Sequence, residues 1–137
     1  MVIKKVIIIF IIICCALKSE AQLYKLLNLT EQEVRKEVTK YHFVDRREHD
    51  FNITLTFKNR AKEIEFYCVF YFGLDKCGSV RSFESIKNLN KVKKKLDKQF
   101  TIIGSNRWRS KEGVFEVYIN INDDKMLISY SRGFSTY

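Results

Sequence analysis

The sequence predicts an α+β protein: one antiparallel sheet with two helices packed on one face, in a helix-then-meander order that is arranged twice. A capping box at residues 30–33 marks the start of the first helix, and an apolar stripe with helical spacing marks the second. Runs of strand-like residues follow each helix. Strands that are grouped after a helix, instead of alternating singly with helices, favour an antiparallel α+β arrangement.

The first 21 residues have the pattern of a secretory signal peptide. Two lysines precede an unbroken apolar run, Val6–Leu17, and Ser19-Glu20-Ala21 then supplies small residues at the two positions that a signal peptidase reads. The apolar run is clearly shorter than the roughly 20 residues that a membrane-spanning helix needs. We therefore expect cleavage after Ala21 and export, either to a periplasm or out of the cell.

In the first half of the remaining chain, Thr30 can cap a helix that begins at Glu31, and Glu33 completes the capping box. Val34 and Val38 recur at helical spacing, which predicts a helix to about Tyr41. Four strand-like runs follow this helix, separated by short turn signals. They are His42–Glu48, Phe51–Phe57, Lys62–Phe72 and Gly78–Phe83.

In the second half, four apolar residues at helical spacing predict a helix at about Ser85–Lys98. They are Ile86, Leu89, Val92 and Leu96. Alternation and turn residues then predict three strands, with the turn Asn122–Lys125 between the last two. The strands are Phe100–Ile103, Val114–Ile121 and Met126–Ser131.

Residues 22–137 are enough for a single domain with one core, and nothing in their composition suggests a linker or a second domain. Their high aromatic content excludes an intrinsically disordered chain. The leader holds three basic residues and one acid, so cleavage lowers the formal net charge from +9 to +7. A basic exported domain favours acidic proteins or anionic surfaces as partners, although a lysine-rich composition and ordinary solubility explain the charge equally simply.

Cys68 and Cys77 remain after the leader is removed, and a pair of cysteines in an oxidising compartment usually forms a disulfide. If residues 73–76 form a tight turn, however, Phe72 faces Cys77 and Cys68 lies further down the strand. The two sulfurs then meet only if a bulge or a wider loop shifts the register.

Two groups of residues are candidate binding sites. A basic ridge lies opposite the apolar stripe of the second helix and consists of Lys87, Lys91, Lys94 and Lys98. Such a ridge can bind an anionic surface or an acidic protein, and it is also what a solvated helix face looks like. The second group is Arg107-Trp108-Arg109. An exposed tryptophan between arginines suits a macromolecular contact, whereas strand alternation favours a core tryptophan with outward arginines.

The sequence contains no phosphate-binding loop, nucleophile elbow or zinc-protease helix, and we expect neither a metal nor a cofactor. His42 and His49 are the only histidines. With Cys68 and Cys77 they do not form the close ligand pairs of a structural zinc site. A small basic nuclease would use histidine and glutamate as acid and base, and the residues that would serve are His42, Glu48, His49 and Glu65.

The leader that ends at Ala21-Gln22, the Leu29-Thr30-Glu31-Gln32-Glu33-Val34 opening and the meander after it are similar to small exported bacterial proteins. This pattern resembles the SmpA/OmlA outer-membrane assembly proteins, and its doubled form resembles the β-lactamase inhibitor protein fold. The chain lacks the lipidated cysteine that is typical of the assembly lipoproteins. The resemblance implies binding instead of catalysis.

The leading hypothesis from the sequence is therefore a non-enzymatic exported domain. It would bind a macromolecule, either a protein or an anionic surface but not nucleic acid, through an exposed sheet face or the basic ridge. A small secreted hydrolase such as a nuclease and a structural envelope component are the alternatives.

Overall fold

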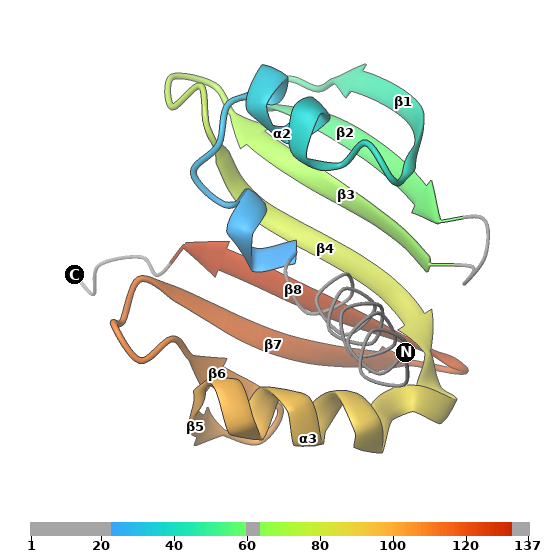
Figure 1. Ribbon diagram of the computed structural model, residues 1–137, viewed down its shortest axis with the longest axis vertical. Helices are drawn as coiled ribbons and strands as arrows, with labels where there is room; N and C mark the ends of the chain where they lie inside the picture. The colour runs from blue at the N-terminus through green and yellow to red at the C-terminus, as the bar shows by residue number, and fades with distance from the viewer. Residues whose placement is uncertain (1–22, 60–63, 133–137) are drawn as a thin grey trace, which may run out of the picture.

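A computed structural model describes residues 23–59 and 64–132. Eight antiparallel strands form one sheet in the order β1-β2-β3-β4-β8-β7-β6-β5 (Figure 1). The two meanders, β1–β4 and β5–β8, join where β4 pairs with β8. The strands are β1 (His42–Glu48), β2 (Asn52–Asn59), β3 (Ile64–Tyr71), β4 (Cys77–Ser85), β5 (Thr101–Gly104), β6 (Arg107–Arg109), β7 (Phe115–Asn122) and β8 (Lys125–Arg132).

The helical segments are short and lie on one side of the sheet (Figure 1). They are the 3₁₀ turns η1 (Leu23–Leu26) and η2 (Ile86–Asn88) and the α-helices α2 (Glu31–Glu37) and α3 (Leu89–Gln99). The capping box of α2 is present, with the Glu33 backbone amide donating to the Thr30 Oγ1 at 3.3 Å. The helix ends before the predicted Tyr41, whose ring packs edge-on against Phe66 instead.

The predicted fold class, α+β with two helices packed on one face of the sheet, is wrong. The protein is mostly an eight-stranded antiparallel sheet, and its two helices are short. At 1.5 Å per residue α2 is about 10 Å long and α3 about 16 Å, whereas eight strands spaced about 4.8 Å apart span about 34 Å. Each helix buries a single side chain fully, Val34 from α2 and Leu96 from α3, so the helices do not form a complete layer.

The sheet has two different faces. The covered face carries the core, in which buried side chains from six strands pack against the helices and against η1. Its members on the strands include Leu55, Phe57, Phe66, Cys68, Phe70, Val80, Trp108, Val117, Ile119, Met126, Ile128 and Tyr130. The opposite face carries the alternate residues of the same strands, and none of the described helices lies on it (Figure 1); we call it the uncovered face.

A bulge between β3 and β4 sets the position of the cysteines. Val69 pairs with Ser79 and Phe70 pairs with Cys77, so Gly78 is an extra residue on β4. The extra residue brings Cys77 to the covered face, where Cys68 also lies, and both thiols are buried and free. Hydrogen bonding with Cys77, together with burial, raises the pKa of Cys68. A side chain at position 78 would require the Tyr71 ring to shift, because a Cβ atom would lie 2.9 Å from that ring.

The predicted leader, residues 1–21, and the first two residues of the predicted strand Lys62–Phe72 lie outside the described residues. Within the described part of the chain, no helix is both long and apolar enough to cross a bilayer.

Candidate functional site

A row of aromatic and arginine side chains crosses five strands on the uncovered face. The register places Tyr67 on β3 opposite Arg81 on β4, and Arg81 opposite Ser129 on β8. Ser129 in turn pairs with Tyr118 on β7, which pairs with Arg107 on β6. Because paired residues point to the same face of a sheet, these five residues form one continuous line, which we call the aromatic–arginine row.

Arg81 lies in the middle of this row, among three tyrosines. Its guanidinium carbon is 5.9 Å from the centroid of the Tyr67 ring. Hydrogen bonding with Tyr67 raises the pKa of Arg81 against the opposing effect of burial, and Tyr118 and Tyr71 contribute in the same direction. A guanidinium held over an aromatic ring keeps its charge while losing part of its freedom to move.

Two polar atoms at the centre of the row are buried and have no hydrogen-bond partner among residues 23–59 and 64–132. They are the Nε of Arg81 and the Oγ of Ser129, a residue that is 0% exposed. A buried polar group that makes no hydrogen bond costs about 1–3 kcal/mol. Such groups are rare in folded proteins, and here a donor and an acceptor occur on paired residues of two neighbouring strands.

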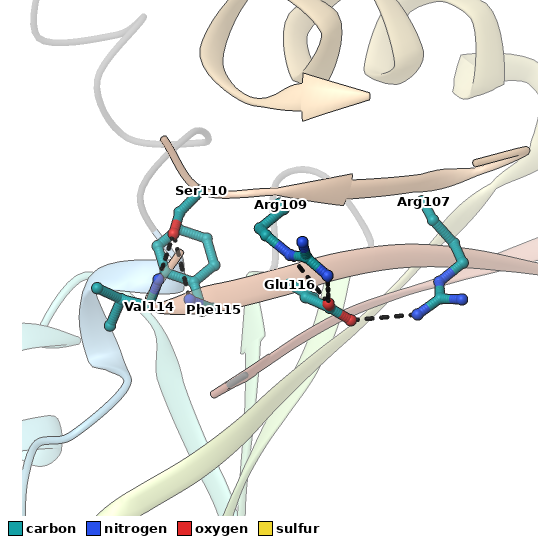
Figure 2. Close-up of polar contacts among 6 residues, drawn as sticks. All are labelled: Arg107, Arg109, Ser110, Val114, Phe115 and Glu116. Carbon is teal, nitrogen blue, oxygen red and sulfur yellow. Dashed lines mark hydrogen bonds and ion pairs between the residues drawn. The ribbon is translucent and has the colours of Figure 1, made fainter. Parts of the chain in front are cut away.

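At the β6 end of the row, two arginines share one acid. Arg107 donates to Glu116 Oε2 at 3.2 Å, and Arg109 donates to Glu116 Oε1 at 2.8 Å, as Figure 2 shows. Arg109, and then Arg107, lower the pKa of Glu116 against the effect of burial. We call this group the Glu116 clamp; both arginines contact its one carboxylate, and one net positive charge remains on the group.

The turn before β7 positions Glu116. Ser110 Oγ accepts from the backbone amides of Val114 at 2.8 Å and Phe115 at 3.2 Å, which closes the connection between β6 and β7 (Figure 2). Val114 and Phe115 therefore have defined positions, and the next residue is directed toward the arginines of β6.

Trp108 is not part of this surface. It is 2% exposed and lies on the covered face, where its indole Nε1 donates to Asp97 Oδ1 of α3 at 2.8 Å. Only the two arginines of the sequence Arg107-Trp108-Arg109 are exposed. The three residues thus occupy both faces of the sheet and do not form one binding patch.

The basic ridge is split between two elements. Lys87 belongs to η2, whereas Lys91, Lys94 and Lys98 belong to α3, and all four are exposed. Lys91 also lines a cleft of about 1060 Å³ on the helical side of the sheet. Apolar and acidic residues share this cleft with the lysines, among them Val92, Leu96, Tyr130, Glu84 and Asp124.

The residues considered for a nuclease are not brought together. His42 and His49 flank the seven-residue strand β1 at opposite ends. His49 and Glu65 line a shallow hollow of about 380 Å³ beside Tyr67, whereas Glu48 contacts Arg46 on the other face. Among residues 23–59 and 64–132, no group of three or more histidine, cysteine or acidic residues could hold a metal ion.

Sequence reasoning did not identify Tyr67, Arg81 and Tyr118 as site residues. The available signal was strand alternation, since each of them neighbours a residue buried in the core: Phe66, Val80 and Val117. Their approach to one another depends on β4 pairing with β8, which joins the two halves of the chain.

Comparison with protein-family models, with curated proteins and with solved structures found no match. The resemblance to the SmpA/OmlA and β-lactamase inhibitor proteins therefore stays a prediction from the sequence.

Proposed function

We propose that this protein is a non-enzymatic exported domain that binds a partner protein through the uncovered face of its sheet. The observation that carries the proposal is the aromatic–arginine row, which spans five strands on the face opposite the helices. Tyrosine and arginine are the residue types that contribute most to protein–protein contacts, because each combines a large apolar surface with a polar end.

The composition of the face supports a protein partner over a flat anionic surface. Cations and acids alternate on it, with Arg47 bonded to Asp45 and Arg109 bonded to Glu116. A surface with charges of both signs binds an anionic polymer or lipid weakly, whereas it can match a protein with complementary charges. The basic ridge of α3 lies on the helical side and is not needed for this contact.

A photo-cross-linking experiment tests which surface binds. A photoreactive phenylalanine analogue replaces Asn120, an exposed residue of β7 on the uncovered face, in the full chain expressed in cells that export it. The matched control places the same analogue at Lys94, which is exposed on α3. We expect a discrete cross-linked product from position 120 and none from position 94.

The substitution Tyr118→Ala in the same chain serves as the specificity control, and we expect it to remove the product. A product from position 94 but not from 120 would contradict the proposal, as would a product from position 120 that persists in Tyr118→Ala. Mass spectrometry of the exported protein tests the leader separately, and we expect a mature chain that begins at Gln22.

A further inference from the structure

We propose that Arg81 is the anchor of the uncovered face and binds a carboxylate group of the partner protein. This inference rests on the proposed function and adds the chemistry of the contact. It follows from the difference between Arg81 and the other cations of the same face.

The first step is the charge balance of the face. Four other cations each contact an acid: Arg47 with Asp45 at 2.6 Å, Lys58 with Glu65 at 3.8 Å, and Arg107 and Arg109 with Glu116. The charged and polar groups that act on Arg81 are the hydroxyls of Tyr67, Tyr71 and Tyr118. No carboxylate from residues 23–59 or 64–132 forms an ion pair with it, so its positive charge is available to a partner.

The second step is the match between the site and a carboxylate. A guanidinium presents two parallel N–H groups along each edge, and a carboxylate accepts both at once. The site offers one full positive charge surrounded by neutral hydroxyl groups, which corresponds to the single negative charge of an aspartate or glutamate side chain. A phosphate dianion is better matched by several cations, and the nearby arginines of β6 are already occupied by Glu116.

The third step is the restricted position of Arg81. Its Nε–H is buried and finds no acceptor among residues 23–59 and 64–132, so a carboxylate that comes from solvent binds through the other edge of the guanidinium, formed by its two terminal nitrogens. The Tyr67 ring, whose centroid is 5.9 Å from the guanidinium carbon, limits the movement of Arg81, so less side-chain entropy remains to be lost on binding. The terminal nitrogens of Arg81, beside Tyr67, are therefore the place where a planar acceptor binds.

Nuclear magnetic resonance of the arginine Nε–Hε groups tests this inference directly in residues 22–137, the mature chain. The buried Nε of Arg81 is protected from exchange with water, so its resonance is a suitable reporter. The probe is a capped hexaglutamate peptide, and a capped hexaglutamine peptide and a capped phosphoserine hexapeptide are the controls. Ionic strength is kept equal, because charge effects are screened by salt.

We expect hexaglutamate to shift the Arg81 resonance in a saturable way and hexaglutamine to leave it unchanged. Arg81→Gln should weaken binding of the peptide at least about tenfold, which corresponds to about 1.4 kcal/mol. Arg81→Lys should recover only part of this loss, because an ammonium does not offer the planar pair of donors. In the control Arg107→Gln, we expect affinity to change by less than about twofold.

Three results would overturn the inference: an unmoved Arg81 resonance, a response to phosphoserine but not to glutamate, or shifts confined to the lysines of α3. The cross-linking experiment separates this failure from failure of the proposed function. If the Asn120 product forms equally well in Arg81→Gln, the face binds a partner but Arg81 is not its anchor. If no product forms from position 120 in any chain, the proposed function itself fails.

Discussion

The two meanders follow the same plan, a helix and then four strands, but their outer strands are attached in different ways. The outer strand β1 of the first meander has seven residues and is mostly exposed, and the Arg46–Glu31 ion pair joins it to α2 at the surface. The outer strands β5 and β6 of the second have four and three residues. There a buried indole, Trp108, joins β6 to α3.

The comparison shows how strand length and anchoring compensate for each other. A long strand gains a ladder of backbone hydrogen bonds from its neighbour, and β1 pairs with β2 over almost its whole length. A strand of three residues gains few such bonds, so a large buried side chain must hold it in place. Four experiments test this difference.

The largest effect is expected from Trp108→Ala. Removing a buried tryptophan leaves a cavity and should lower the free energy of unfolding by about 3–5 kcal/mol. Trp108→Phe should recover part of this loss, because it restores packing but not the hydrogen bond to Asp97. Urea denaturation followed by circular dichroism gives both values. An effect no larger than that of Phe43→Ala, on the exposed strand β1, would remove the proposed contrast between the two meanders.

The second effect concerns Cys68 and Cys77, which both lie in the first meander. Because the bulge at Gly78 places Cys68 and Cys77 on one face, oxidised glutathione should convert the two thiols into a disulfide and be reduced itself. Closing so short a loop should raise the free energy of unfolding by about 2–3 kcal/mol. Urea midpoints with and without a reductant measure this gain, and Cys68→Ala/Cys77→Ala should show none. Two reactive thiols in the oxidised, unfolded protein would contradict this prediction.

The third effect depends on pH and belongs to the second meander. Arg109 and Arg107 lower the pKa of Glu116 in the folded protein, so the unfolded chain binds a proton more readily than the folded chain. The Glu116 clamp should therefore contribute stability above about pH 4.5 and lose it as the pH falls through the lower, folded pKa. Urea midpoints measured between about pH 6 and pH 3 should decline less steeply in Glu116→Gln. Glu112→Gln, at an exposed acid in the same connection, is the control, and equal slopes for both variants would exclude the clamp as the cause.

The smallest effect is expected at the outer strand of the first meander. Glu31 contacts an exposed Arg46 at 3.1 Å, and exposed ion pairs contribute little because water and salt screen them. A double-mutant cycle with Arg46→Ala and Glu31→Ala should give a coupling smaller than any of the three effects above. The coupling should also vanish at high salt. A coupling that persists in high salt would show that this pair anchors β1 as Trp108 anchors β6.

Several elements of the fold could be predicted because their signals are local. The capping box at Thr30 needs only four consecutive residues, and the structure confirms it. Alternation along Phe51–Phe57 indicates a strand and its two faces, since the side-chain period of a strand is independent of its partners. Helix ends were predicted less well. The apolar spacing of Val34 and Val38 continues past the point where the backbone leaves the helix at Val38.

The aromatic–arginine row around Arg81 was not among the candidate sites that were predicted from the sequence. The basic ridge and the Arg107-Trp108-Arg109 sequence were the predicted candidates, because their residues are close in the chain. The residues of the row come from five strands, and Tyr67 and Tyr118 approach each other only through the pairing of β4 with β8. The contacts of Arg107 and Arg109 with Glu116 also depend on strand register, which no single segment specifies.

Local sequence indicates where most helices and strands begin and which side chains of each strand share a face, and it predicts that Cys68 and Cys77 meet only if a bulge or a wider loop shifts the register. These properties depend on a few neighbouring residues and on fixed backbone periods. Tertiary structure sets the dominance of the sheet over the short helices, the position of all described helices on one face, and the position of Arg81 among tyrosines, where no acid from residues 23–59 or 64–132 pairs with it. These properties depend on the pairing of strands that are far apart in the chain, and that pairing is selected by packing of the whole core.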